Sequence, residues 1–408
     1  MKHLGAVVFA AVCFVCLCGF TVDFGTRQAE VDDTVLQGGW FNYDAKAAVT
    51  GGKSLQQRAE NIKTARQFEM AFPDVVNYLE RFIAGVEVKP NDGRVVFHPH
   101  EERRFTVMGQ SNGRRVDRDK LYGDILAHLK GTPDKVVVEF LPVAHMPANE
   151  IVKKITKRAE FSTHFEDNPP REHNIALAVK CFDGLVVEPG QEISFNKIVG
   201  RRSEARGYQE AKIIIDGEYV EGVGGGVCQV STTVFNAAVR AGLHITESHN
   251  HSLRSSYVPL GHDAMVSSAV DLRFANTTGA TVYFETAVRN NRVFVTVYGR
   301  DKGDGIHYAL STLVTKKYPP AEKQDTAFAI GDAVLADFAL HPEYYNKIIT
   351  HDGEDGYATT TYIETYKGER LLSKKVLRRS TYRAQPIKYR IVKKSVPSLP
   401  TQPTDLDT

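Results

Sequence analysis

Apolar residues recur at helical spacing in the first half of the chain and alternate with polar residues between those stretches. Helical spacing over residues 55–73 and over Asp117–Lys130 predicts two helices. A short apolar run over Val136–Val143 predicts a strand between helical segments. This mixture predicts an α+β module over residues 55–165.

A second group of periodic segments follows. Residues 171–182 have the spacing of a short helix, and an Asp-Gly pair within 211–222 predicts a hairpin. Three consecutive glycines, Gly224 to Gly226, precede a longer helical pattern that stops at Gly242. Apolar strands separated by Asn-rich turns come next. We therefore expect a mixed α+β core over residues 166–300, with a Gly-rich loop leading into a central helix.

The last quarter of the chain is predicted to be rich in strands. We expect a connector over 301–331, a β-rich module over 332–394 and a disordered tail over 395–408, where prolines and polar residues dominate. The whole pattern predicts an α+β multidomain fold with an α+β first module and a β-rich last one.

The N-terminus has the character of an export signal. An uncharged apolar run extends from Gly5 to Val22, and about 18 such residues can span a bilayer as a helix. Lys2 precedes this run and acidic residues follow it, which places the bulk of the chain outside the cytoplasm. We expect a signal-anchor over residues 1–23 in a cell membrane and a polar linker over 24–54. A cleaved signal peptide with secretion is the alternative.

Composition and charge argue against two classes of protein, nucleic-acid binders and disulfide-rich secreted domains. A chain of 408 residues with a net charge of +2 gives no electrostatic case for binding nucleic acid. Cys181 and Cys228 are the two cysteines in the exported part, which is not a disulfide framework. They could form one disulfide or remain two free thiols.

Cys228 stands in the most informative stretch, "GGGVCQVSTTVF". The glycines Gly224, Gly225 and Gly226 permit positive φ and a close ligand, and the cysteine falls in the first turn of a helix. Free amides at a helix start lower the pKa of a thiol and could hold an oxyanion. We assign Gln229 and Ser231, together with the three glycines, to this loop and oxyanion region, and we expect Ser231 to cap the helix.

Two histidines and an aspartate follow the cysteine. His249 and His251 would share a face if their segment is extended, and Asp263 lies further along. Cys, His and Asp in this order are typical of transglutaminase-like and papain-like acyl-transfer sites. Cys228 could instead be a small buried side chain. A third alternative is zinc held by His249, His251 and His262-Asp263, which we rank below thiol chemistry because no second ligand stands close to Cys228.

Over Phe161–Gly299 the chain resembles the VanW family of exported bacterial proteins. The resemblance is carried by "HNIALA", "PGQEISFNKIVG", "GGGVCQVSTTVFNAAVRAGL" and "DLRFAN". Ser248 takes the place of an arginine that is usual in the family, and Met265 that of a threonine. The resemblance implies a cell-envelope location, a link to peptidoglycan and an association with glycopeptide resistance, but no settled reaction.

The flanking modules carry looser resemblances. Residues 74–165 are similar to the peptidoglycan-binding module that often precedes VanW domains. The last module resembles the five-glycine domain of bacterial surface proteins, with Gly353, Gly356 and Gly368 at matching positions. Both resemblances imply contact with the cell wall.

These observations favour a membrane-anchored, extracytoplasmic envelope protein that binds or acts on peptidoglycan, with no cofactor and no metal. The alternative is a Cys-dependent acyl transferase or hydrolase, an amidase or transpeptidase in which Cys228 attacks a wall peptide, His251 acts as base and Asp263 orients it, with His249 as a further candidate. A non-catalytic envelope scaffold is the second alternative.

Overall fold

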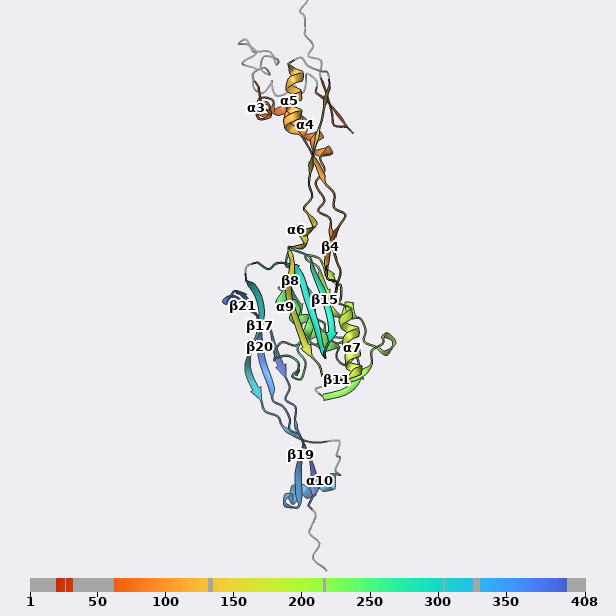
Figure 1. Cartoon of the computed structure of the whole chain (residues 1–408). Helices are drawn as coiled ribbons and strands as arrows, with labels where there is room; N and C mark the ends of the chain where they lie inside the picture. Colours follow the sequence, from red (N-terminus) through yellow and green to blue (C-terminus); the bar gives the residue numbers. More distant parts are fainter. Residues whose placement is uncertain are drawn as a thin grey trace, which may run out of the picture. The chain divides into compact units, whose positions relative to one another are not determined.

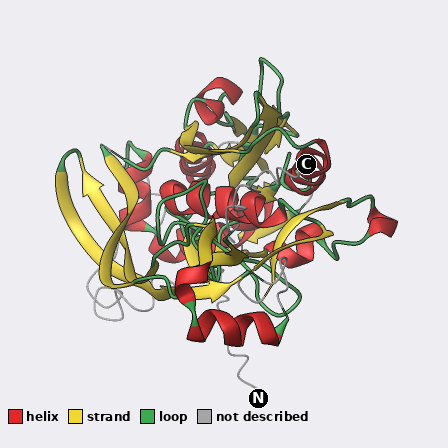
Figure 2. Ribbon diagram, turned by 90° about the horizontal axis from the view of Figure 1, so that it is seen from below, coloured by secondary structure: helices red, strands yellow, loops and turns green. Residues whose placement is uncertain are grey.

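The computed structural model describes residues 20–25, 27–31, 62–130, 135–215, 218–303, 305–325 and 331–394. The chain divides into two compact units. Unit 1 comprises Met1–Val96 and Val107–Ile151, and unit 2 comprises Phe97–Thr106 and Val152–Thr408. Helices and strands are interspersed throughout (Figure 2), so the predicted α+β multidomain fold is confirmed.

Unit 1 packs helices against short strands. Its core joins apolar side chains of α4 and α5, including Leu79, Ile83, Leu121 and Ile125. The helices are α3 (Ala65–Ala71), α4 (Pro73–Val86), α5 (Arg118–Leu129) and α6 (Ala148–Val152). The strands are β1 (Phe20–Asp23), β2 (Gln28–Val31), β5 (Gly113–Val116), β6 (Lys135–Val137) and β7 (Phe140–Val143). β3 (Arg94–Phe97) and β4 (Phe105–Met108) begin in one unit and end in the other.

The N-terminal predictions fall partly outside the described residues. Residues 1–19 of the predicted anchor and 32–54 of the predicted linker are among those not described. The start of the linker differs from the prediction, because β2 pairs with β1 and Phe24 is buried. These strands are too short to show periodicity, and β1 is held by a distant partner, β6. No helix within the described ranges is long and apolar enough to cross a bilayer.

Unit 2 holds the remaining elements (Figure 1). Its helices are α7 (Pro169–Lys180), α8 (Phe195–Val199), α9 (Val227–Ala241) and α10 (Asp332–Leu340). Its strands are β8 (Ile155–His164), β9 (Val186–Val187), β10 (Glu192–Ser194), β11 (Glu210–Ile215), β12 (Glu218–Val223), β13 (His244–Glu247), β14 (Arg273–Ala275), β15 (Val282–Arg289), β16 (Arg292–Arg300), β17 (Ile306–Tyr318), β18 (Glu322–Gln324), β19 (Tyr345–His351), β20 (Gly356–Lys367), β21 (Arg370–Tyr382) and β22 (Ile387–Lys393).

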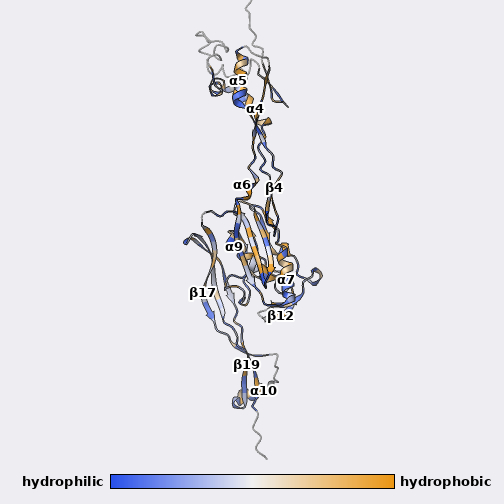
Figure 3. Cartoon of the chain, in the orientation of Figure 1, coloured by the Kyte–Doolittle hydropathy of each residue, from blue (hydrophilic) through white to orange (hydrophobic). Residues whose placement is uncertain are grey.

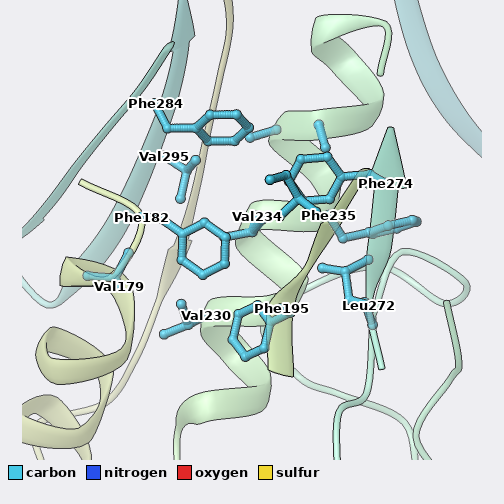
Figure 4. Close-up of a cluster of buried hydrophobic side chains, with 14 of the residues drawn as sticks. Val179, Phe182, Phe195, Val230, Val234, Phe235, Leu272, Phe274, Phe284 and Val295 are labelled. Carbon is cyan, nitrogen blue, oxygen red and sulfur yellow. The ribbon is translucent and has the colours of Figure 1, made fainter. Parts of the chain in front are cut away.

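The core of unit 2 lies around α9. A four-stranded sheet in the order β8-β16-β15-β9 packs on α7 and α9, and β13 and β17 also contact α9. Side chains from both helices, the sheet and β14 meet in one apolar cluster (Figure 4). Because α9 is covered on all sides, its polar residues must find hydrogen-bond partners inside the protein.

The domain boundaries differ from the predicted ones at two places. β8 lies in the sheet of unit 2, although the boundary at residue 165 placed it in the first module. The predicted connector 301–331 contains β17, which pairs along its length with β20. In β8 and β17, apolar and polar residues alternate imperfectly. The partner strands are remote in sequence, so local periodicity could not reveal the two strands.

The C-terminal part is β-rich, as predicted. It consists of two three-stranded sheets in the orders β17-β20-β21 and β18-β22-β19. Hydrophobic colour is dense on β15 and weaker along β17 (Figure 3), which fits one buried sheet and one largely solvated sheet. The predicted tail, 395–408, lies outside the described residues.

Candidate active site

The glycine loop before α9 is held in a conformation that other residues would resist. Gly224 and Gly226 have φ of 88° and 104°, which glycine adopts without strain. Gly225 lies against β11, and a Cβ there would come within 2.7 Å of the backbone of Ala211. The loop therefore brings the start of α9 close to β11 and fixes the position of the first turn of the helix.

Cys228, the second residue of α9, is the part of this turn that reaches the surface. It is partly exposed, whereas every other residue of α9 except Arg240 is buried. Its Sγ lies 3.3 Å from the carbonyl oxygen of Val266. The Cys228 amide has no hydrogen-bond acceptor among the residues that the structure describes. A thiol and a free helix-start amide thus come from the same residue.

His251 and Asp263 form a buried pair beside this thiol. His251 Nδ1 donates to Asp263 Oδ2 over 2.7 Å, and the backbone amide of His251 donates to the same oxygen over 2.7 Å. The two residues are only 4% and 1% exposed. Nδ1 faces the carboxylate, which leaves Nε2 for another partner, and the side chains of His251 and Cys228 lie close enough to shift each other's pKa.

The charges of Cys228, His251 and Asp263 stabilise one another. Burial by itself would raise the pKa of the Cys228 thiol, but the hydrogen bond and charge of His251 bring that pKa below its usual 9.0. Burial would lower the pKa of His251, but Tyr257, Asp263 and Cys228 hold it well above the usual value. Despite burial, His251 holds the pKa of Asp263 down. The arrangement therefore favours a thiolate–imidazolium pair beside a carboxylate.

Buried polar residues of α9 fix the loop that carries Asp263. Ser231 Oγ donates to Ala264 O over 2.5 Å, and Ala264 N donates to Thr232 Oγ1 over 3.0 Å. Asn236 Nδ2 donates to His262 O over 2.7 Å. Helical spacing places these side chains on one side of α9. They hold the loop against the helix near Cys228.

The predicted capping role of Ser231 is wrong, and the side chain of Gln229 has partners other than the predicted ones. The residue that caps α9 is Gly226, without a side-chain hydrogen bond, whereas Ser231 also donates to Cys228 O. Gln229 Nε2 donates to His164 O over 2.8 Å, and its Oε1 accepts from Arg171. Its amide group therefore ties α9 to β8 and α7 and does not line an oxyanion site.

The structure separates the two histidines of "HNH". His249 Nε2 lies 3.1 Å from Glu247 Oε1, with 42% of its side chain exposed, whereas His251 is enclosed with Asp263. The main chain of His249 forms an isolated bridge with Met265. Of the predicted catalytic residues, the structure thus brings together Cys228, His251 and Asp263 and leaves His249 outside.

The alternatives involving a disulfide or a metal find no geometric support in the described ranges. Cys181 and Cys228 are free thiols. No group of three or more His, Cys, Asp or Glu side chains among the described residues is arranged to hold a metal ion. Burial and nearby Arg240 lower the pKa of His262 to about 4, so this imidazole is neutral at pH 7.

Two residues of β21 that sequence reasoning missed complete the surroundings of Asp263. The Tyr382 hydroxyl donates to Asp263 Oδ1 over 2.6 Å, and Arg378 Nη2 lies 3.2 Å from the same oxygen. They follow Asp263 by more than 100 residues in a strand with no motif. No local signal could have identified them.

Comparisons with known proteins match the part of the chain that holds the three residues. The family model described as "VanW like protein" matches residues 170–298. The "Uncharacterized protein YoaR" of Bacillus subtilis (strain 168) is 38% identical over 173 residues, 41% of this chain and 57% of the relative. The "Vancomycin B-type resistance protein VanW" of Enterococcus faecalis (strain ATCC 700802 / V583) is 22% identical over 188 residues, 43% of this chain and 68% of the relative.

A solved structure described as "Crystal structure of HP0197-G5" is 10% identical, with a TM-score of 0.11, and covers 21% of this chain and 93% of its own. That TM-score carries no argument about the fold, so the five-glycine resemblance stays a prediction. The alignment with the first relative covers less than two thirds of that relative's length. The family model and the relative named VanW nevertheless agree: residues 170–298 of this chain are a VanW-like domain.

Proposed function

We propose that this protein is a membrane-anchored, extracytoplasmic envelope protein whose VanW-like domain cleaves or transfers peptide bonds of peptidoglycan with Cys228 as nucleophile. The observation that carries the chemistry is the buried His251–Asp263 hydrogen bond beside Cys228, whose thiol at the start of α9 has its pKa lowered by His251. The envelope location and the peptidoglycan substrate rest on the N-terminal apolar run and the family resemblance. The name of the Enterococcus relative, a vancomycin resistance protein, agrees with a role at the wall.

The first half-reaction forms a thioester. The Cys228 thiolate attacks the carbonyl carbon of a peptide amide, and a C–S bond forms as the carbonyl oxygen takes the negative charge. His251 then gives its proton to the leaving nitrogen, the C–N bond breaks and an amine departs. Asp263 stays ionised and keeps Nδ1 protonated, so that Nε2 faces the reacting atoms.

The second half-reaction restores the thiolate. Water or the amine of a second peptide attacks the thioester carbonyl, His251 takes the proton of the incoming group, and the C–S bond breaks. Water as acceptor gives a hydrolysed peptide, and an amine gives a new cross-link. The acceptor decides between amidase and transpeptidase activity.

The start of α9 is suited to the charge that develops in both steps. The free Cys228 amide lies in the first turn of α9, where the dipole favours an anion, whereas the Gly224 amide of the glycine loop already donates to Gln209 O. Removing one such donor typically slows acyl transfer about 10²–10³-fold. Gln229 makes no such contribution, because its side chain is engaged with β8 and α7.

Peptidoglycan binding is the non-catalytic part of the proposal. In this account unit 1 and the β-rich C-terminal part hold wall material while the VanW-like domain reacts with it. Retention of an inactive variant on the wall would show that binding does not need the thiol. A non-catalytic scaffold protein would neither change the wall peptides nor stay bound to the wall.

The test uses the full chain with purified sacculi and compares wild type, Cys228→Ala and Cys181→Ala. Mass spectrometry of the digested wall should show altered stem peptides or cross-links with wild type and with Cys181→Ala, since the Cys181 thiol is exposed and its hydrogen-bond partner is Leu177 O. Cys228→Ala should still cosediment but leave the wall unchanged. Equal products from Cys228→Ala would refute the enzyme proposal, and loss of cosedimentation of all three would refute the peptidoglycan proposal.

Membrane anchoring is tested separately by fractionating cells that produce the full chain. The protein should stay with membranes after a high-salt wash and leave them in detergent. Recovery of a shortened chain in the medium would favour the cleaved signal peptide instead.

A further inference from the structure

We propose that Arg378 and Tyr382 of β21 are positioning residues for the cysteine site, fixing the carboxylate of Asp263 so that it can orient His251. The inference rests on the proposed function and deepens it. Both residues lie outside the segment matched by the family model, which ends at residue 298. The C-terminal sheet is thereby part of the site and not only a spacer.

Tyr382 is placed to act through its hydroxyl group. The side chain is 1% exposed, and the hydroxyl oxygen accepts a hydrogen bond from the amide of Gly261 over 2.9 Å. With a lone pair used in this way, the hydroxyl proton points to Asp263 Oδ1, 2.6 Å away. Tyr382 therefore holds both the carboxylate and the loop residue two positions before it.

Arg378 contacts the same loop with one end of its guanidinium. Nη2 donates to Gly261 O over 3.1 Å, to Asp263 Oδ1 over 3.2 Å and to Asp263 O. The guanidinium carbon lies 5.6 Å from the centre of the Phe235 ring of α9. Arg378 thus joins the loop, the helix and β21 at one point.

The rest of the Arg378 side chain is poorly satisfied. Its Nε and Nη1 are buried without a hydrogen-bond partner among the described residues. Buried donors without partners oppose folding, so an apolar residue of similar size would serve stability as well or better. The contacts that offset this cost are those of Nη2 with Gly261 O and with Asp263, and the Asp263 carboxylate is the charged partner among them.

The two oxygens of Asp263 have separate tasks. Oδ2 accepts both hydrogen bonds from His251, and Oδ1 accepts those from β21. With both oxygens held, the carboxylate cannot rotate away from the imidazole. Arg378 and Tyr382 also lower the pKa of Asp263, which keeps it ionised opposite the imidazolium.

Hydrogen bonds to the main chain of residues 381 and 383 hold the end of β21 independently of the Arg378 and Tyr382 side chains. Arg383 N donates to Ser252 O over 2.7 Å, and Asn250 Nδ2 donates to Thr381 O over 3.0 Å. These bonds flank His251 on both sides. Because they survive substitution of Tyr382, a hydroxyl deletion should test positioning without releasing the strand.

The experiment measures alkylation of Cys228 in the full chain by iodoacetamide as a function of pH, with mass spectrometry of the Cys228 peptide. The test variants are Tyr382→Phe and Arg378→Gln. Matched controls are Tyr366→Phe, which removes a tyrosine–carboxylate bond to Glu364 in the same sheet, and Arg379→Gln, an exposed neighbour. A second readout is the NMR signal of the His251 Nδ1 proton, and thermal unfolding is followed for every variant.

Each test variant should alkylate about tenfold more slowly at pH 7, which corresponds to a shift of about one pH unit in the midpoint. The Nδ1 proton signal should broaden or move in both, and both controls should match wild type. Unchanged midpoints and signals in Tyr382→Phe and Arg378→Gln, with or without a lower Tm, overturn the positioning role and leave the proposed function standing.

Wild type with an ordinary thiol midpoint would instead contradict the proposed function. In that case the Nδ1 signal alone decides the positioning role: a change in Tyr382→Phe but not in Tyr366→Phe upholds it, and no change in either overturns it.

Discussion

Unit 2 contains two buried carboxylates with similar partners and different surroundings. Asp263 accepts hydrogen bonds from a tyrosine and an arginine of β21. Glu364 of β20 accepts them from Tyr366, from Lys374 and from Ser311. In both, a tyrosine hydroxyl and a cation hold a carboxylate that is less than 10% exposed.

The difference lies in what the remaining oxygen can reach. All three partners of Glu364 lie within its own sheet. These bonds therefore link the carboxylate to no histidine or thiol. Asp263 has an oxygen left for His251, and through it for the partly exposed thiol of Cys228. The same local solution for a buried charge therefore stabilises a sheet in one place and can drive chemistry in the other.

The largest contrast is expected from removing the thiol. Cys228→Ala should lower acyl transfer to wall peptides by at least about 10³-fold, because the remaining groups cannot form the thioester. Cys181→Ala should retain wild-type kinetics. Product formation per enzyme, measured with soluble stem peptides, checks both. Residual turnover within tenfold of wild type in Cys228→Ala would show that another group is the nucleophile.

Neutralising the two carboxylates should separate them. Asp263→Asn should lower kcat/KM by about 10³–10⁴-fold, since an amide at this position favours the wrong tautomer of His251. Glu364→Gln should leave kcat/KM within about twofold of wild type, because no reacting group is linked to it. If the two variants have similar kinetics, the comparison fails.

The loop that carries Asp263 should depend on α9 for its stability. Ser231→Ala leaves the carbonyl of Ala264 poorly satisfied and should lower the free energy of unfolding by about 1–2 kcal/mol. Ser380→Ala is the control, because the Ser380 hydroxyl is buried without a partner among the described residues; it should be neutral or slightly stabilising. Denaturant unfolding of the two variants measures the difference, and equal losses would contradict it.

The smallest effect concerns acid stability. Lys374, Ser311 and Tyr366 lower the pKa of Glu364 to about 2, below its unfolded value of 4.5. The folded state therefore gains stability above about pH 4.5 and loses it as the pH falls towards 2. Tm should decrease by a few degrees over this range, and Glu364→Gln should flatten that part of the curve. A variant with the full wild-type slope would show that other groups cause it.

Much of the site could be predicted because its residues sit in local patterns. Three glycines before a helical repeat place Cys228 in a first turn, and the alternation in "HNH" sets two histidines apart from the neighbouring asparagine. The pattern could not decide between His249 and His251. That choice depends on Met265, which pairs with the first, and on Asp263, which lies beside the second.

The errors arose where partners are distant in sequence. Ser231 and Gln229 are residue types that often serve as helix caps or oxyanion donors. Because α9 is enclosed on all sides, Ser231 instead binds the loop at Ala264, and Gln229 binds β8 and α7. The role of Tyr382 and the existence of β17 depend on contacts with residues that are tens of positions to more than a hundred positions away in the sequence. Such contacts follow from tertiary packing, which local periodicity does not encode.

The most direct measurement is the pH dependence of Cys228 alkylation in the full chain, compared between wild type and His251→Ala. The account predicts a wild-type midpoint clearly below the ordinary thiol value of 9.0, and a return towards that value in His251→Ala. Coincident curves for the two proteins, or a wild-type thiol that reacts only after unfolding, would contradict it.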